Sequence, residues 1–188
     1  MKGSPLASLW MVVASALFAC MGACVKLGAS HFSAAELVFW RGFVALVLIG
    51  AYVFCSGNTV ATPLWRTHLS RSLSGFVSLV LYFLAITTLP LATAVTLSYT
   101  SPLWLAALVA VLAHERFRPA IWGALTLGML GVALLLKPAL AHIPLYGAGF
   151  GLIGAAIAAL AYLNVRKLGE AGEPEWRTVF WFSLICAA

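Results

Sequence analysis

The sequence contains no aspartate, and glutamate supplies all five of its acidic residues. Charged residues make up only 9% of its 188 residues, whereas hydrophobic residues make up 63%. A soluble domain is usually roughly half apolar and about a quarter charged. The scarcity of charge therefore excludes a soluble globular fold, because no core of this size can bury so much apolar surface. It indicates that lipid is the main solvent of the chain.

The missing residue types also exclude several kinds of chemistry. No glutamate lies in the middle of an apolar run, so proton coupling through a buried carboxylate has no candidate in this sequence. The four cysteines form no CxxC pair, and His31, His68, His114 and His142 lack metal-ligand spacing, so we expect no metal site and interpret the histidines as residues of the soluble faces. Paired catalytic groups at one depth are also missing, so we expect neither an enzyme nor a cofactor. The net charge of +6 is scattered rather than clustered, which argues against a nucleic-acid partner.

Long uncharged runs divide the sequence into membrane spans. The expected spans are residues 6–25, 35–54, 70–88, 92–113, 119–136 and 147–165, followed by a partial seventh span that begins near residue 178. Pro90 in TTLPLAT marks the tight turn of a helical hairpin between the third and fourth spans. The 11 residues from 178 to 188 are too few to cross a bilayer as a helix. We therefore expect the chain to be a fragment of a longer protein.

The distribution of lysine and arginine predicts an orientation, because cytoplasmic loops of membrane proteins are enriched in these residues. With a cytoplasmic N-terminus, the basic residues on the inner side are Lys2, Arg66, Arg71, Arg116, Arg118, Arg166, Lys167 and Arg177, and those towards the outside are Lys26, Arg41 and Lys137. We therefore expect a multi-pass protein of the inner (cytoplasmic) membrane, surrounded by the lipid bilayer.

One segment of the sequence occurs in two similar copies. KLGASHFSAAELVFW (26–40) and KLGEAGEPEWRTVFW (167–181) both open with Lys-Leu-Gly and close with Val-Phe-Trp. An odd number of spans separates the two copies, so they lie upside down relative to each other, which is the signature of an inverted-topology repeat. We expect residues 1–138 to form a first five-helix repeat and residues 144–188 to begin a second. In this register Arg41 is equivalent to Phe182.

Three stretches, VFWRGFVALVLI, LPLATAVTLSYTSPLWLAALVAVLAHERF and WGALTLGMLGVALLLKP, resemble the drug/metabolite transporter superfamily, in particular its EamA-type members. The resemblance implies an all-α polytopic transmembrane bundle with an inverted five-plus-five helix repeat, the second repeat being truncated here. It also implies a secondary transporter that moves small metabolites, amino-acid-like compounds or drugs by alternating access, with export as the commoner direction. Arg41, Pro102 and Glu115 stand at positions typical of that family.

Two alternatives remain open at this point. The chain could be a non-transporting integral membrane scaffold or interaction protein, which would have no water-accessible cavity near Pro102. The second alternative concerns assembly, since a carrier of a small-molecule substrate could also work as a homodimer.

The fourth span carries the candidates for the substrate path: Thr93, Thr96, Tyr99, Thr100 and Pro102. The proline removes one backbone donor and tends to kink the helix. The three threonines share one helix face. Polar groups at mid-membrane depth are tolerated only against protein or a water-lined cavity, so this face is expected to line the path. The alternative is that the hydroxyls satisfy backbone groups locally.

The remaining charged candidates lie near span ends. Glu36 and Arg41 are expected to form a gate or a local ion pair, with Arg41 either meeting an anionic group or anchoring its helix at the interface. Glu115 is expected to fix the cytoplasmic end of the fourth helix, and Lys26 to anchor the end of the first. GAGFGLIG (147–154) contains a GxGxxG pattern, which we interpret as small-residue helix packing rather than a dinucleotide site.

Overall fold

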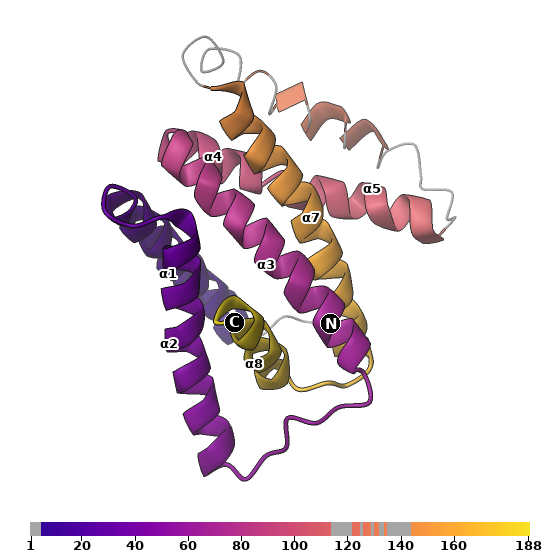
Figure 1. The fold of residues 1–188 in the computed structure, drawn as a ribbon. Helices are drawn as coiled ribbons and strands as arrows, with labels where there is room; N and C mark the ends of the chain where they lie inside the picture. Colours follow the sequence, from indigo (N-terminus) through magenta and orange to yellow (C-terminus); the bar gives the residue numbers. More distant parts are fainter. Residues whose placement is uncertain (1–4, 114–121, 125, 129, 132–133, 135–143) are drawn as a thin grey trace.

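The computed structural model describes residues 5–113, 122–124, 126–128, 130–131, 134 and 144–188 (Figure 1). All regular secondary structure in these residues is helical. The helices with defined bounds are α1 (Pro5–Gly28), α2 (Ala34–Cys55), α3 (Trp65–Thr88), α4 (Leu91–Ser98), α5 (Ser101–Ala113), α7 (Leu145–Glu170) and α8 (Glu175–Cys186). Five segments of this described part are long and apolar enough to cross a membrane, namely Leu9–Gly28, Ala34–Cys55, Trp65–Thr88, Leu91–Val111 and Leu145–Glu170. The predicted all-α, polytopic bundle is thereby confirmed.

The helices of the structure differ from the predicted spans in three places. Helix α3 begins at Trp65, five residues before the predicted start of the span at residue 70, and α7 continues to Glu170, beyond the predicted end at residue 165. The predicted fourth span is two helices, α4 and α5, rather than one. Half of the predicted fifth span, 119–136, lies outside the described residues, and so does Glu115.

The break between α4 and α5 follows from Pro102. A proline has no N–H, so the carbonyl of Ser98 loses the donor that residue 102 would supply in a continuous helix. The hydroxyl of Ser101 donates to that carbonyl instead, at 2.7 Å. The next turn restarts with the N–H groups of Leu103 and Trp104, which both donate to the Thr100 carbonyl. The kink is therefore stabilised by side-chain hydroxyls in place of the missing backbone bond.

Helices α3 and α7 lie side by side and form the centre of the bundle (Figure 1). Small residues of α7 permit this close approach, because a side chain on Gly154 would lie 3.1 Å from the Leu81 Cβ atom. The Ser78 hydroxyl donates to the Gly154 carbonyl at 2.9 Å across the same contact. A Cβ atom on Gly147 would lie 2.6 Å from the Thr88 hydroxyl oxygen. The expectation that the glycines of GAGFGLIG serve helix packing is confirmed for Gly147, Gly151 and Gly154, whereas a Cβ atom on Gly149 would meet nothing within 4 Å.

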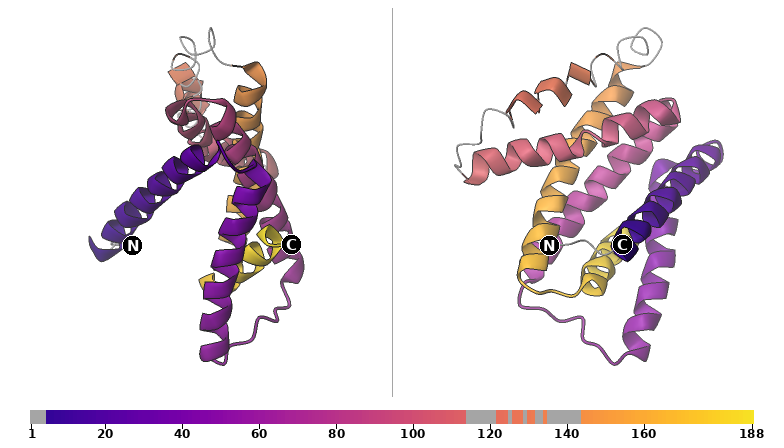
Figure 2. Two further views of the ribbon diagram at one scale, coloured as in Figure 1. Left: turned by 60° about the vertical axis from the view of Figure 1, so that its left-hand side comes forward. Right: turned by 180° about the vertical axis from the view of Figure 1, so that it is seen from behind.

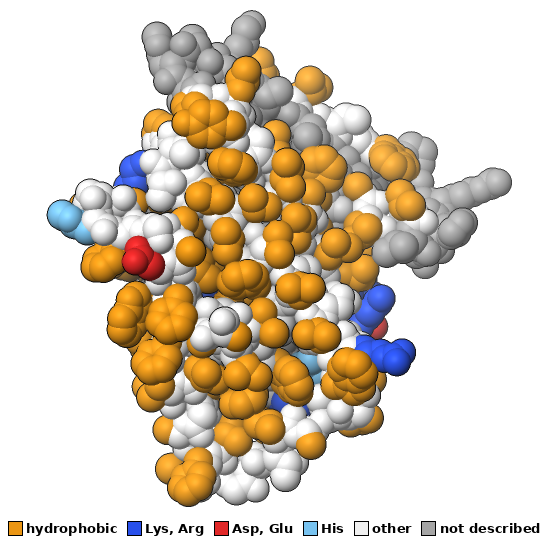
Figure 3. Space-filling view, viewed as in Figure 1, with side chains coloured by type: hydrophobic (Ala, Val, Ile, Leu, Met, Phe, Trp, Pro, Cys, Tyr) orange, Lys and Arg blue, Asp and Glu red, His pale blue; other side chains and the backbone are white. Residues whose placement is uncertain are grey.

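The outer surface is strongly apolar, as expected of helices that lie in a lipid bilayer. Large hydrophobic side chains are exposed along α1 and α2, including Trp10, Met11, Leu48 and Phe54. Figure 3 shows hydrophobic side chains over most of one face, with the charged groups at its edges. Helix α1 diverges from the bundle (Figure 2), and its residues from 9 to 20 are all exposed.

Lys26 fastens the end of α1 to the hairpin between α3 and α4. Its ammonium group donates to the carbonyls of Ile86 at 2.6 Å and Leu89 at 2.8 Å. The Ile86 carbonyl lacks its usual helical donor because residue 90 is a proline. The predicted anchoring role of Lys26 is confirmed, with helix-end carbonyls as its partners.

Replacing Lys26 by methionine is expected to destabilise the protein by about 2 kcal/mol, because two carbonyls then lose a charged donor. Thermal unfolding in detergent micelles measures the loss. Lys26→Arg, which keeps the charge and the donors, is the control and should retain most of the stability. Equal melting temperatures for Lys26→Met and the unmodified protein would contradict the anchoring role.

Candidate functional site

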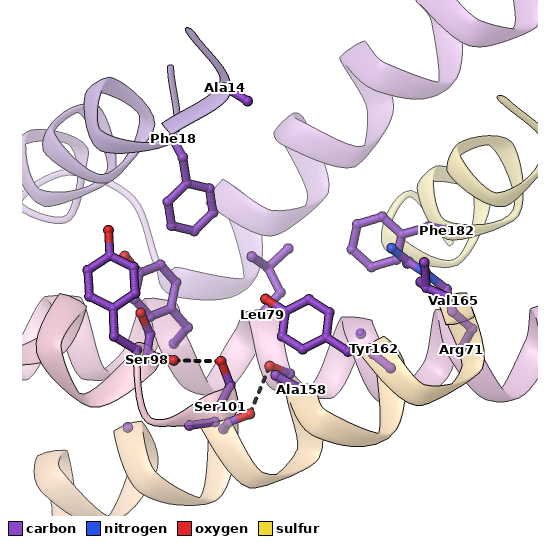
Figure 4. Close-up of a pocket in the computed structure, with 18 of the residues that line it drawn as sticks. Ala14, Phe18, Arg71, Leu79, Ser98, Ser101, Ala158, Tyr162, Val165 and Phe182 are labelled. Carbon is purple, nitrogen blue, oxygen red and sulfur yellow. Dashed lines mark hydrogen bonds between the residues drawn. The ribbon is translucent and has the colours of Figure 1, made fainter. Parts of the chain in front are cut away.

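A cavity of about 600 Å³ lies between the helices. Each helix with defined bounds contributes to its wall, and so does Tyr99 in the break between α4 and α5. Helix α7 supplies a run of small residues on one side, including Gly151, Ala155 and Ala158. Aromatic side chains from other helices face them, including Phe18, Tyr82 and Phe182. Figure 4 shows Ser98 and Ser101 at one end of this space and Arg71 with Phe182 at the other. The cavity is therefore apolar along its length, with hydroxyl groups at one end and positive charge at the other.

Two arginines from different helices meet at the charged end. The guanidinium carbon of Arg71, from α3, lies 4.4 Å from the centre of the Phe182 ring, and that of Arg41, from α2, lies 5.5 Å from the same centre. Both residues line the cavity. A cation near an aromatic face is attracted by the ring quadrupole, so Phe182 of α8 holds the two positive groups at one place.

Two residues of the cavity wall also carry hydrogen-bond donors that lack protein partners. Within the described residues, the Nε and Nη1 atoms of Arg71 and the hydroxyl of Tyr82 are buried and make no hydrogen bond. Tyr82 is held in position by Phe18, whose ring stacks on it at 5.9 Å. Because buried polar groups are nearly always paired in proteins, these donors are suited to acceptor groups on a bound molecule.

The predicted substrate-path residues are divided by the fold. Tyr99 lines the cavity and is 69% exposed. Thr96 and Thr100 donate their hydroxyls to carbonyls of α4, those of Ala92 and Leu97, and neither belongs to the described cavity lining. Thr93 and Pro102 also lie outside that lining. The neighbouring serines Ser98 and Ser101 line it instead.

Glu36 and Arg41 are not brought together. Glu36 forms a capping box with Ser33, whose backbone N–H donates to the carboxylate at 2.7 Å and whose hydroxyl accepts from the Glu36 N–H at 3.3 Å. Arg41 lies over Phe182 instead. The S-x-x-E pattern at 33–36 could have revealed this cap in the sequence. Of the three ion pairs found among the described residues, none joins Glu36 to Arg41.

The comparison with known families agrees with this architecture. A sequence model described as the EamA-like transporter family matches residues 5–137. The chain belongs to the EamA-like transporter family.

Curated relatives of this member of the family are exporters or transporters by their names. The pseudopaline exporter CntI of Pseudomonas aeruginosa is 33% identical over 175 residues, which cover 93% of this chain and 61% of the relative. An uncharacterized transporter of Helicobacter pylori is 26% identical over 163 residues, 85% of this chain and 55% of the relative. The S-adenosylmethionine uptake transporter of Rickettsia felis is 28% identical over 104 residues, 55% of this chain and 35% of the relative. The chain thus spans about three fifths of the length of the exporter. No solved structure matches the chain.

A second polar cluster of the chain lies outside the cavity, where the loop before α3 meets the turn between α7 and α8. The Glu173 carboxylate accepts hydrogen bonds from the Thr62 hydroxyl and, at 2.6 Å, from the Arg177 guanidinium, and it lies 3.6 Å from the His68 Nε2 atom. Arg177 also donates to the Thr59 carbonyl at 3.0 Å. These contacts fasten together two segments that the charge distribution places on the same side of the membrane.

The expectation that histidines lie on the soluble faces is wrong for His68. Its side chain is fully buried in the first turn of α3, against the Trp181 ring and Glu173. The burial of Glu173 acts to raise the pKa of its carboxyl, but the hydrogen bonds from Thr62 and Arg177 and the nearby positive charge outweigh it, so the pKa lies below its usual value of 4.5. The carboxylate is therefore ionised at neutral pH and holds the cluster together.

Proposed function

We propose that this protein is a secondary carrier that moves small molecules across the cytoplasmic membrane by alternating access, with export as its direction and the N-terminus in the cytoplasm. The observation that carries the proposal is the open cavity of about 600 Å³ lined by helices from both predicted repeats. A volume of this order accommodates a metabolite or drug-sized molecule. The name of the Pseudomonas aeruginosa relative supports export. A carrier of this kind is a transporter and not an enzyme.

The register of the predicted inverted repeat supports the mechanism. Arg41 of α2 and Phe182 of α8 occupy equivalent positions in the duplicated segment, and they are in contact. The two helices pack together and run in opposite directions (Figure 1). Equivalent residues meet in this way when a pseudo-two-fold axis passes between the two segments. Movement of one repeat about such an axis is the usual basis of alternating access in carriers with inverted repeats.

Accessibility of Tyr99 tests the proposal against a non-transporting scaffold. In the protein expressed from its natural gene, with native cysteines replaced, Tyr99→Cys is expected to react with a membrane-impermeant thiol reagent from both sides of the membrane. In alternating access the cavity opens first to one side of the membrane and then to the other, so residue 99 becomes accessible from each side. Labelling in intact cells and in inverted vesicles, read by mass shift, makes the comparison.

Val47→Cys provides the matched control, since Val47 is 54% exposed on the apolar surface of α2 and does not belong to the described cavity lining. Lipid surrounds this position, so no labelling is expected from either side. If Tyr99→Cys is as unreactive as Val47→Cys, the protein is a non-transporting scaffold rather than a carrier. Labelling of Tyr99→Cys from one side only would contradict alternating access.

A further inference from the structure

The charged end of the cavity has a property that the proposed transport function does not by itself require. Arg41 and Arg71 converge on Phe182, and none of the described residues that line the cavity is acidic. Two like charges in an apolar wall repel each other and lose hydration energy. Charged groups within membrane spans are stable only when a partner or water compensates them. The pair therefore attracts negative charge from a source outside this wall.

The acidic residues of the described chain are engaged elsewhere or lie away from the cavity. Glu36 caps α2, Glu170 pairs with Arg166 at 2.8 Å, and Glu173 pairs with Arg177 at 2.6 Å. Glu175 stands in the first turn of α8 and is not part of the cavity lining. The described protein thus offers the two cavity arginines no carboxylate.

Unpaired donors of two wall residues add a second, independent observation. The Nε and Nη1 atoms of Arg71 are buried and, within the described chain, unbonded, as is the hydroxyl of Tyr82. A guanidinium group binds both oxygens of a carboxylate through two parallel N–H groups, so an arginine whose donors lack protein partners is suited to this ligand. The surrounding wall, formed by side chains such as Leu79, Val165 and Phe18, is suited to an apolar or aromatic body.

We propose that this cavity selects small organic carboxylates, with the carboxylate bound between Arg41 and Arg71 and the apolar body extending towards Tyr99. The inference rests on the proposed carrier function and names its substrate class. Because Phe182 occupies the position equivalent to Arg41 in the second segment, the carboxylate site is not duplicated by the repeat. One anionic group per transport cycle is expected at this end.

Phenylglyoxal, which modifies guanidinium groups, tests the site directly. The protein expressed from its natural gene is placed in phosphatidylcholine nanodiscs, and modification rates of single arginines are measured by peptide mass spectrometry. The probes are phthalate and its neutral diamide, phthalamide, which share one ring. Saturating phthalate is expected to slow modification of Arg41 and Arg71 by about tenfold, corresponding to roughly 1.4 kcal/mol, whereas phthalamide should not. Arg66, an exposed residue over the Trp65 ring, is the internal control and should react equally throughout.

Substitutions provide the second arm. Arg71→Gln is expected to weaken phthalate binding about tenfold, because charge-assisted hydrogen bonds are lost. Arg71→Lys should restore part of the affinity, and Arg66→Gln should leave it unchanged. If Arg71→Gln does not fold, the labelling of the unmodified protein still decides the question. Equal modification of Arg41 and Arg71 with and without phthalate would overturn the proposal.

Two further arms separate related outcomes. Protection of the arginine pair by phosphatidylglycerol nanodiscs without phthalate would assign the pair to lipid headgroups and overturn the carboxylate site. Phthalate flux through proteoliposomes then separates the two proposals. Arginine protection without flux would refute the carrier and leave the binding site, whereas flux without protection would refute the site and leave the carrier.

Discussion

Substitution of Gly42 by leucine is expected to separate α8 from α2 and to destabilise the protein by about 3 kcal/mol or more. A Cβ atom at Gly42 would lie 2.5 Å from the Cys186 Cβ atom and 2.8 Å from its carbonyl carbon. The neighbouring backbone cannot rotate away as a flexible side chain could, so one helix must move. Overpacking of a tight contact costs about 1–3 kcal/mol and occasionally more. Thermal unfolding in detergent detects the change, at about 2–4 °C per kcal/mol for a chain of this size.

Gly50→Leu is the matched control, because Gly50 lies in the same helix and a Cβ atom there meets nothing within 4 Å. Both substitutions gain the same helix propensity, so their difference isolates the contact with Cys186. Phthalate binding should fall in Gly42→Leu as well, since Phe182 of α8 holds the arginine pair. Equal melting temperatures for the two variants would show that α2 and α8 tolerate a wider separation.

Glu173→Ala is expected to have the second large effect, a loss of about 2–3 kcal/mol. The carboxylate is only 7% exposed, and its removal leaves Arg177, 17% exposed, without its ion-pair partner. Breaking a buried ion pair costs about 3–5 kcal/mol, and the partial exposure of Arg177 reduces this figure. Chemical or thermal unfolding measures the loss. Glu175→Ala, two residues away and exposed, should change the stability little.

The same cluster predicts a pH dependence. Because the pKa of Glu173 in the folded protein lies below 4.5, its stabilising contribution is fully present above pH 4.5 and is lost as the pH falls through the folded value. The isosteric substitution Glu173→Gln removes this dependence. The difference in melting temperature between the unmodified protein and Glu173→Gln should therefore be constant at neutral pH and shrink below pH 4.5. A difference that persists unchanged into strong acid would contradict the pKa direction.

The transmembrane organisation could be predicted because it depends on local composition. An uncharged run long enough to cross the bilayer must form a helix, since lipid offers no partner to unpaired backbone groups. The spans, the hairpin at Pro90 and the helix break at Pro102 follow from this rule and from the missing proline N–H. The odd number of predicted spans between the duplicated segments follows in the same way.

The functional side chains were harder to predict, because a helical face does not reveal its neighbour. The threonine face of the fourth span is predicted to line the substrate path. In the structure, however, the hydroxyls of Thr96 and Thr100 donate to carbonyls of their own helix. A hydroxyl can satisfy a local carbonyl as well as a ligand, and the sequence does not distinguish the two. Of the five candidates predicted in the fourth span, only Tyr99 belongs to the described lining of the cavity.

The sequence by itself determined that the chain is a multi-pass helical membrane protein, because hydrophobic partitioning and backbone hydrogen bonding act on each segment separately. Only the tertiary structure decided that Arg41 and Arg71 meet. The charge distribution predicts that they lie towards opposite sides of the membrane, but α2 is displaced along its axis relative to α3 (Figure 1). Both guanidinium groups therefore lie close to the ring of Phe182. Such a displacement depends on contacts between helices, such as that of Gly42 with Cys186, which no single segment encodes.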